Sequence, residues 1–425
     1  MKYVIIGNST AGISAAEAIR SKDPKGSITL ISEEAYTTYS HPLITYWLAG
    51  KLDSEGMYYK GRKYAGDLNA SEMLGRKAVE LDVKKKKVRL EGGEVVAYDR
   101  LLIATGGTPF VPPVKGGELN GVFTFTKWED ARAVKAYISK HKVKKVVVVG
   151  GGLIGLKTTE ALVELGLKVT VLELADRILS ATFDKKASKV MLAYLKDRGV
   201  DIITENTVEE IRGVDGSVAG VSLRDGRKIA CGLVILAIGV RPNMEIVQGT
   251  GMATGRGIIV DSHMETSIPD VYAAGDVAEA HDCLIDSSRT IAIWPLAVKQ
   301  GRVAGLNMAG VKTDYPGGFP MNSVEIHGLP TISVGITDPV DKGFQVIKDS
   351  DPDNYEYRKI VLKDGKVKGV IFIGRIDRAG IFTGLIGDKV DVDKIRDDLL
   401  NDDFGLITLP KGYMKHEVKG PGMSV

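Results

Sequence analysis

Two glycine-rich segments of this chain have the composition and spacing of turns that bind phosphate groups. The first, GNSTAG, spans residues 7–12, and the second, GGGLIG, spans residues 150–155. A glycine permits a tight turn, and a helix that begins inside such a turn directs unpaired N–H groups and its positive dipole end at an anion. The second segment matches GxGxxG in full, whereas Ser9 stands at the middle glycine of the first. The residues of the two turns that we expect to contact bound ligands are Gly7, Ser9, Ala11, Gly12, Gly150, Gly152, Leu153, Ile154 and Gly155.

A carboxylate follows each turn at a similar distance. Glu33 lies about twenty residues beyond the first turn, and Glu173 has a comparable place beyond the second. A carboxylate there accepts hydrogen bonds from ribose hydroxyls and repels a 2′-phosphate. The two units together predict two dinucleotide sites, and Glu173 favours NADH over NADPH in the second. Arg177 is near enough to offer a phosphate partner, although a helix cap or a surface contact is the commoner use of such a residue.

The hydrophobic pattern predicts the elements that position these residues. Short apolar runs rich in β-branched residues, at 3–6, 27–31, 146–149 and 169–172, predict buried strands on either side of each turn. Apolar residues at helical spacing predict a helix between the strands of each pair. The fold class is therefore α/β, with two Rossmann-like dinucleotide-binding units.

Other segments complete the predicted framework. The sequence TKWE at 126–129 fits a capping box for a helix that runs towards His141. From about residue 319 the pattern changes to strands joined by hairpin turns, which predicts a third, α+β domain. The tail from Leu409 to Val425 is predicted to be an extended surface segment.

Composition excludes several classes of function. The chain has 425 residues and a formal net charge of +3, which is too small to indicate nucleic-acid binding. No run is long and apolar enough to predict a membrane span. The two cysteines, Cys231 and Cys283, are far apart, so the sequence predicts neither a disulfide framework nor an iron–sulfur or other metal site. We expect a protein of the reducing cytoplasm.

Taken together, the motifs resemble the two-dinucleotide flavoprotein oxidoreductases with the glutathione-reductase fold. The opening turn and the segment PLI at 42–44 look most like NADH:rubredoxin oxidoreductases, and flavin subunits that serve ferredoxin-like partners are also similar. The marks that carry the resemblance are the two turns, ATG at 104–106, GVRPN at 239–243 and AGD at 274–276.

The resemblance implies the cofactors and the domain boundaries. In that family the first unit binds FAD and the second binds NADH or NADPH, and Glu173 makes NADPH the less favoured of the two. The FAD-binding domain is discontinuous in the family, which implies residues 1–110 and 243–318 here. The NAD(H)-binding domain would then comprise residues 111–242, and a C-terminal α+β interface domain would comprise residues 319–425.

The resemblance also implies residues that contact the flavin. Asp276 would bind a ribityl hydroxyl, and the helix that starts near Trp294 would direct its N-terminus at the flavin pyrimidine ring. His41 precedes Pro42 in the segment expected near the flavin, where a structural role competes with proton transfer. Trp294 would lie against the flavin or fill a domain interface. The cofactor-binding residues that the resemblance adds are His41, Pro42, Thr105, Gly106, Gly239, Gly275, Asp276, Trp294 and Pro295.

Lys157 is a departure from the family pattern. Relatives carry a glutamate at this place, often paired with a lysine from the flavin segment, and an ungapped comparison puts Tyr46 at the lysine position. One hypothesis is that Lys157 lies at the flavin–nicotinamide junction and stabilises reduced flavin. The alternative is that Lys157 turns to solvent. With His41, these two residues are the candidate catalytic residues.

The leading functional hypothesis is an FAD-dependent oxidoreductase that takes a hydride from NADH and passes electrons to a small iron–sulfur or rubredoxin-type protein. An NADH oxidase or CoA-disulfide reductase is the second hypothesis. Relatives of that kind carry a redox cysteine in the segment equivalent to residues 39–46, which contains none here. The third is a non-catalytic, redox-sensing subunit. We also expect a homodimer through the C-terminal domain, while the sequence leaves the natural electron acceptor open.

Overall fold

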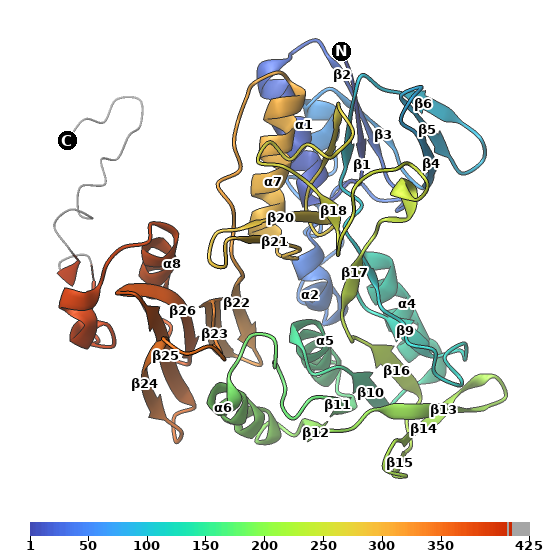
Figure 1. Ribbon diagram of the computed structural model, residues 1–425. Coiled ribbons are helices and arrows are strands. Elements are labelled where there is room, and N and C mark those ends of the chain that lie inside the picture. The colour runs from blue at the N-terminus through green and yellow to red at the C-terminus, as the bar shows by residue number, and fades with distance from the viewer. Residues whose placement is uncertain (406–407, 410–425) are drawn as a thin grey trace. The chain divides into compact units, whose positions relative to one another are not determined.

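The computed structural model describes residues 1–405, 408 and 409, which divide into two compact units (Figure 1). The first unit contains Met1–Leu174 and Glu205–Phe319, and the second contains Ala175–Thr204 and the described residues after Phe319. The segment 175–204 thus clusters with the C-terminal part of the chain. The separation of the first unit into FAD-binding and NAD(H)-binding domains stays a prediction. The predicted extended tail lies, after Leu409, outside the described residues.

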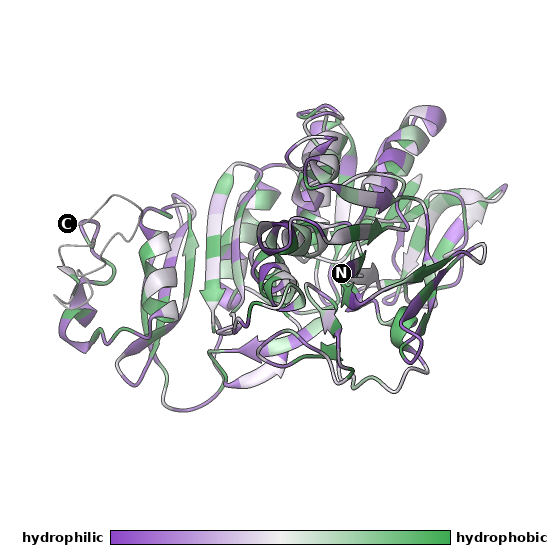
Figure 2. Ribbon diagram, turned by 90° about the horizontal axis from the view of Figure 1, so that it is seen from above, coloured by the Kyte–Doolittle hydropathy of each residue, from purple (hydrophilic) through white to green (hydrophobic). Residues whose placement is uncertain are grey.

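A parallel sheet carries the first glycine turn. Four of its five strands are largely buried, which explains why they are short apolar runs rather than alternating ones; the edge strand after residue 69 is the exception. Strand residues accordingly contribute much of the hydrophobic colouring in Figure 2. The five strands, in spatial order, are β19 (Val271–Ala273), β7 (Arg100–Ile103), β1 (Lys2–Ile6), β2 (Ser27–Ile31) and β3 (Ala70–Met73).

Helices α1 (Thr10–Lys22) and α7 (Trp294–Met308) lie side by side (Figure 1). Two glycines of α7 permit this close packing. A Cβ at Gly301 would lie 2.1 Å from the Ala11 carbonyl oxygen, and one at Gly305 would lie 2.4 Å from the Ala15 carbonyl oxygen. Since the contacts advance along both helices together, the two N-termini point in the same direction.

A second parallel sheet carries the second glycine turn. Its first-unit strands, in spatial order, are β11 (Lys168–Leu172), β10 (Lys145–Val149), β16 (Leu233–Leu236) and β9 (Val122–Thr124). Helix α5 (Leu153–Glu164) follows the turn after β10, and α4 (Trp128–His141) follows β9. Between these helices, α2 (Ile44–Leu48) contacts both α4 and α5. Helix α2, which follows β2 along the chain, therefore packs against the two helices that accompany the second parallel sheet.

The predicted capping box of α4 is shifted by one residue. Asp130, not Glu129, provides the capping carboxylate, which accepts hydrogen bonds from the N–H groups of Thr126 (2.7 Å) and Lys127 (3.1 Å). The helix begins at Trp128, whose side chain is buried.

The first unit contains further small sheets and short helices. The small strands between residues 78 and 97 form one of these sheets. The remaining elements are η1 (His41–Leu43), α3 (Tyr64–Asp67), β4 (Ala78–Asp82), β5 (Lys87–Leu90), β6 (Val95–Ala97), β8 (Gly107–Pro109), β13 (Val208–Val214), β14 (Ser217–Leu223), β15 (Lys228–Ile229), β17 (Val240–Pro242), η2 (Glu245–Val247), β18 (Ile258–Ile259), β20 (Ala278–Asp282) and β21 (Ser287–Arg289).

The second unit is built on an antiparallel sheet, which confirms the predicted change to an α+β pattern. Its order is β22 (Met321–Ile326), β23 (Leu329–Gly335), β26 (Lys366–Ile373), β25 (Glu356–Lys363) and β24 (Gln345–Asp351). The unit also contains α6 (Lys185–Lys196), β12 (Asp201–Ile203), α8 (Ala379–Gly387) and η3 (Asp393–Asp398).

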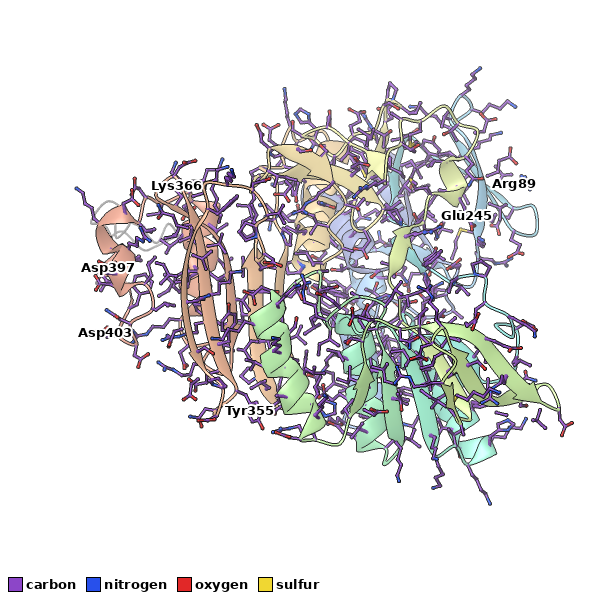
Figure 3. All side chains as sticks on the ribbon, turned by 60° about the horizontal axis from the view of Figure 1, so that its bottom comes forward. Arg89, Glu245, Tyr355, Lys366, Asp397 and Asp403 are labelled. Carbon is purple, nitrogen blue, oxygen red and sulfur yellow. The ribbon has the colours of Figure 1, made fainter. Side chains whose placement is uncertain are left out.

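Specific polar contacts explain why 175–204 belongs with this sheet. Asp184 caps α6 and also accepts hydrogen bonds from the Tyr357 hydroxyl and the Lys359 ammonium, both at 2.8 Å. The Lys359–Asp184 ion pair is nearly buried, with side chains 7% and 12% exposed. Tyr355, labelled in Figure 3, donates a hydrogen bond to Asp197 just after α6. Within the described residues, no helix is both long and apolar enough to span a membrane.

Candidate functional site

The two glycine turns have the same backbone construction. Gly7 and Gly150 have φ values of +117° and +115°, which favour glycine. A Cβ at Gly7 would lie 2.0 Å from the Ala104 carbonyl oxygen, and one at Gly150 would lie 2.3 Å from the Ala237 carbonyl oxygen. The last glycines are equally constrained, since their Cβ atoms would lie 2.0 Å (Gly12) and 1.9 Å (Gly155) from the carbonyl oxygen of the first glycine. Only glycine therefore fits at either end of each turn.

The middle position of each turn is open. Ser9 and Gly152 are the N-cap residues of α1 and α5, with nearly the same extended backbone (φ −100°, ψ −166° and φ −80°, ψ −176°). A Cβ at Gly152 would meet no described atom within 4 Å, so the fold itself does not require glycine there. Ile154, in the first turn of α5, is 38% exposed. Open space and exposed apolar surface at a helix N-terminus fit a dinucleotide with its diphosphate at the N–H groups.

Residues from distant parts of the chain gather beside the first turn. A Cβ at Gly275 would lie 3.1 Å from the Ala11 Cβ, and the Gly275 N–H donates to Gln300 Oε1 of α7 at 2.8 Å. Asp276 follows directly, and burial raises the pKa of its carboxyl to about 6. Trp294 begins α7, and its ring meets the Tyr59 ring edge-on at 6.1 Å. The structure thus brings together α1, the Gly275 turn and α7, as the expected flavin contacts require.

His41 contacts the first turn directly. Its Nδ1 lies 3.2 Å from the Ser9 Oγ, and its ring stacks on Tyr39 with centroids 4.3 Å apart. On its other side, Nε2 lies 3.9 Å from a carboxylate oxygen of Glu34. Burial, and then the charge of Lys127, lower the pKa of His41 to about 4, so the imidazole is neutral near pH 7. A neutral, stacked imidazole is suited to orienting the Ser9 hydroxyl.

The two adjacent glutamates after β2 have different surroundings. Glu33, the expected ribose ligand, forms an ion pair with Lys127 at the N-terminus of α4. Glu34 accepts a hydrogen bond from the Tyr39 hydroxyl at 2.8 Å, and burial raises the pKa of its carboxyl. The expected contact of Glu33 with a ribose stays a prediction, and the sequence analysis did not name the more buried Glu34.

Glu173 lies against the second turn, while its expected contact with a ribose stays a prediction. The Gly151 N–H donates a hydrogen bond of 2.7 Å to the Glu173 carboxylate. Arg177 instead pairs with Asp176 and Asp338 inside the second unit, at 2.9 Å and 3.2 Å. This surface use of Arg177 is one of the alternatives that the sequence left open.

Lys157 does not turn to solvent, so that alternative is wrong. Its side chain is only 15% exposed and forms an ion pair of 2.5 Å with Glu160, one turn further along α5. Its ammonium also lies 4.9 Å from the centroid of the Tyr46 ring. The positions of the family's glutamate–lysine pair are therefore still neighbours, with a cation–aromatic contact between them. Glu160 was missed, although its i,i+3 spacing from Lys157 is a usable signal.

These residues line a small pocket between α2 and α5. Lys51 and Glu164 form a second ion pair of 2.6 Å across it. The buried Thr45 Oγ1 has no hydrogen-bond partner among the described residues. The full lining is Thr45, Tyr46, Ala49, Lys51, Lys157, Glu160, Ala161 and Glu164.

Two antiparallel strands, β8 and β17, connect the two Rossmann-like parts. Thr105 Oγ1 donates to the Asn243 carbonyl oxygen at 2.7 Å, and the Asn243 N–H donates to the Gly106 carbonyl oxygen at 2.9 Å. The Phe110 N–H donates to the Gly239 carbonyl oxygen at 2.9 Å. The expected cofactor residues Thr105, Gly106 and Gly239 thus lie at the crossing.

The two cysteines have different surroundings. Cys231 is buried, and burial raises its pKa to about 11. The Cys283 thiol lies 3.6 Å from the Gly318 carbonyl oxygen, to which it donates. Among the described residues, no group of three or more His, Cys, Asp and Glu side chains is placed to hold a metal ion.

Comparison with known protein families agrees with this architecture. Residues 1–301 match the pyridine nucleotide-disulphide oxidoreductase family, and residues 320–390 match the rubredoxin NAD+ reductase C-terminal domain. The first match covers more than half of the chain, so the protein belongs to the pyridine nucleotide-disulphide oxidoreductase family. It is an NAD(P)H-dependent FAD oxidoreductase, which confirms the predicted class of enzyme and its cofactors.

Individual relatives differ in their described activities. The chain is 31% identical over 399 residues to the NADH-dependent phenylglyoxylate dehydrogenase subunit epsilon of Aromatoleum evansii. This match covers 93% of each protein. The chain is 33% identical over 344 residues to an NADH oxidase of Methanocaldococcus jannaschii, covering 79% of this chain and 76% of that protein. The solved covalent putidaredoxin reductase–putidaredoxin complex is similar with a TM-score of 0.84 and 26% identity, covering 92% of this chain and 94% of that one.

Proposed function

We propose that this protein transfers electrons from NADH, through FAD, to a small iron–sulfur or rubredoxin-type protein. The observation that carries the proposal is the pair of glycine turns in one unit, each built so that only glycine fits at its ends and each followed by a carboxylate. The match of residues 320–390 to a rubredoxin reductase domain supports a protein acceptor. The likeness to a reductase captured with its redox partner also supports one.

The chain's own residues bind and orient the cofactors. FAD supplies hydride acceptance and one-electron release when it is bound. We propose that residues 1–110 and 243–318 form the FAD-binding domain, with the first turn, Asp276 and the N-terminus of α7 as its main contacts. Residues 111–242 would form the NADH-binding domain, with the second turn and Glu173 as its main contacts. We further propose that the protein works in the cytoplasm and that the C-terminal domain provides a dimer interface.

We propose that Lys157 and Tyr46 lie at the junction of flavin and nicotinamide. The pocket between α2 and α5 places the two side chains in contact. The Glu160 carboxylate neutralises much of the Lys157 charge, so its effect on the flavin would be smaller than that of an unpaired cation. Lys157→Met should therefore slow reduction by NADH without removing it.

An NADH oxidase is the second candidate, because two relatives carry that name. Disulfide chemistry is less well supported, since the segment 39–46 contains no cysteine and Cys231 is buried with a raised pKa. Reduction of oxygen to hydrogen peroxide would need FAD, one NADH and oxygen as the electron acceptor, but no thiol. The distinction between the two candidates therefore rests on the electron acceptor.

The test is a comparison of acceptors under anaerobic and aerobic conditions. The purified protein is given NADH with a rubredoxin, a [2Fe–2S] ferredoxin, CoA disulfide or oxygen alone. We expect rapid reduction of one of the electron-transfer proteins and slow oxygen consumption. Turnover with oxygen alone at the same rate would replace the proposal with an NADH oxidase, and turnover only with CoA disulfide would overturn it. The ratio of kcat/KM for NADH and NADPH should exceed unity, and Glu173→Arg should lower it.

A further inference from the structure

The first glycine turn contains a serine where the second contains a glycine. A serine at an N-cap position ordinarily accepts a hydrogen bond from the N–H groups of the first helical turn. The Ser9 side chain makes no such bond to the first turn of α1, all of which the structure describes. Its hydroxyl instead lies 3.2 Å from His41 Nδ1. The N–H groups at the start of α1 are thus left for an anion, although a capping residue is present.

Several contacts hold His41 in this orientation. Its ring stacks on Tyr39 at 4.3 Å with an interplanar angle of 21°. Tyr39 is itself fixed, because its hydroxyl donates to the Glu34 carboxylate at 2.8 Å and accepts from the backbone N–H of Trp128 at 3.0 Å. Glu34 also faces the far side of the imidazole, 3.9 Å from Nε2. The imidazole is therefore oriented by residues that do not themselves belong to the turn.

We propose that His41 is a positioning residue for the Ser9 hydroxyl, and that this pair takes the place of the usual middle glycine in binding the FAD diphosphate. With the proton on Nδ1, His41 donates to Ser9, whose own O–H is left to donate to a phosphate oxygen. Without His41, the hydroxyl would cap α1 and compete with the diphosphate for the same N–H groups. The inference rests on the proposed binding of FAD at this turn.

A double-mutant cycle separates this role from a merely structural one. The affinity of the flavin-free protein for FAD is measured by flavin fluorescence in the wild type, His41→Leu, Ser9→Gly and the double variant. A neutral hydrogen bond of ordinary strength predicts about fivefold to tenfold weaker binding for His41→Leu. In the Ser9→Gly background, the cost of the same change should shrink to less than about twofold. His41→Gln, whose amide can donate to Ser9, should retain most of the wild-type affinity.

His141 offers a matched control. It stacks on Tyr137 with almost the same geometry, 4.2 Å and 22°, at the other end of α4. His141→Leu removes an equivalent stacked imidazole and should leave FAD affinity unchanged.

Two results would overturn the inference. An equal loss of affinity for His41→Leu in both backgrounds would mean that His41 contacts FAD directly or only supports the fold. No loss in either background would mean that the Ser9 hydroxyl needs no positioning. Failure of the wild type itself to bind FAD would instead contradict the proposed function. If His41→Leu does not fold, full affinity in Ser9→Gly combined with weak affinity in His41→Gln would count against the pairing.

Discussion

The two glycine turns of this protein share their backbone conformation at the first and middle positions but carry different residues between the outer glycines. Both begin with a glycine of φ near +115° and end with a glycine whose Cβ would strike a carbonyl oxygen. The middle residue is Ser9 in one turn and Gly152 in the other, with nearly equal backbone angles. Steric contacts within the fold therefore require glycine at the outer positions. They do not require glycine at the middle position, where the side chain can differ between the two turns.

This difference shows how a departure from a motif can be accommodated. We propose that Ser9 is compatible with phosphate binding because His41, stacked on Tyr39, engages its hydroxyl. In the second turn the position is a glycine, and a Cβ there would meet no described atom within 4 Å. The comparison can be tested by changing the shared positions first and the differing position afterwards.

The largest effect is expected for the shared first glycines. Gly7→Val should abolish FAD retention, because its Cβ would lie 2.0 Å from the Ala104 carbonyl oxygen. Gly150→Val should abolish NADH binding and leave the flavin in place, for the same reason at Ala237. Flavin content and NADH titration measure the two outcomes, and each variant controls for the other. Full flavin content in Gly7→Val would show that the first site is misassigned.

Asp276→Ala should weaken FAD binding next most strongly. Loss of a charge-assisted hydrogen bond costs about 1.5–3 kcal/mol, which corresponds to roughly tenfold to 150-fold in affinity. The Asp276→Asn variant keeps an acceptor and should lose less. Equilibrium titration of the flavin-free variants with FAD gives the comparison. Equal affinities for wild type and Asp276→Ala would remove this residue from the site.

Exchanging the middle residues should give unequal results. Gly152→Ser introduces a hydroxyl with no histidine to engage it, so it should cap α5 and weaken NADH binding by about fivefold to tenfold. Stability should change little, because the new Cβ meets no described atom within 4 Å. Ser9→Gly should change FAD affinity less than about threefold. The measurements are the dissociation constant of NADH for Gly152→Ser and that of FAD for Ser9→Gly. Equal losses of affinity in the two variants would contradict the proposed difference between the turns.

The smallest predicted effect is on the pH dependence of stability. The pKa of His41 is lowered to about 4 in the folded protein, so the unfolded chain binds more protons between about pH 6.5 and pH 4. Stability from His41 is thus present above about pH 6.5 and declines as the pH falls towards 4. The loss of unfolding free energy should stay below about 3 kcal/mol, because the His41 side chain is 29% exposed and solvent screens its charge.

Urea unfolding of wild type and His41→Gln at pH 7 and pH 5 measures this term by difference. Glu34, whose pKa is raised by burial, faces His41 in both proteins, so its contribution largely cancels in the difference. The wild type should lose more stability than His41→Gln between the two pH values. An equal loss would mean that His41 does not titrate abnormally.

The sequence predicted those features that depend on local chemistry. The outer glycines, the buried strands and the carboxylate at Glu173 follow from spacing and periodicity, and Glu173 indeed lies against the second turn. The register of the α4 cap was missed by one residue, because the adjacent carboxylates Glu129 and Asp130 both fit a capping box and only Asp130 accepts the capping hydrogen bonds.

Features that depend on packing between elements could not be predicted from the sequence. The contact of Lys157 with Tyr46 requires α2 to lie against α5. The grouping of residues 175–204 with the C-terminal sheet depends on Lys359 meeting Asp184, which no local pattern indicates. In each case the deciding partner is far away in the sequence.

The central claim is that FAD occupies the first turn and NADH the second, close enough for hydride transfer. Anaerobic titration of the flavin absorbance with NADH tests it most directly, in the wild type and in Gly150→Val. We predict that equimolar NADH bleaches the flavin band of the wild type and leaves the flavin of Gly150→Val oxidised. Equal bleaching in both proteins, or none in the wild type, would contradict the account.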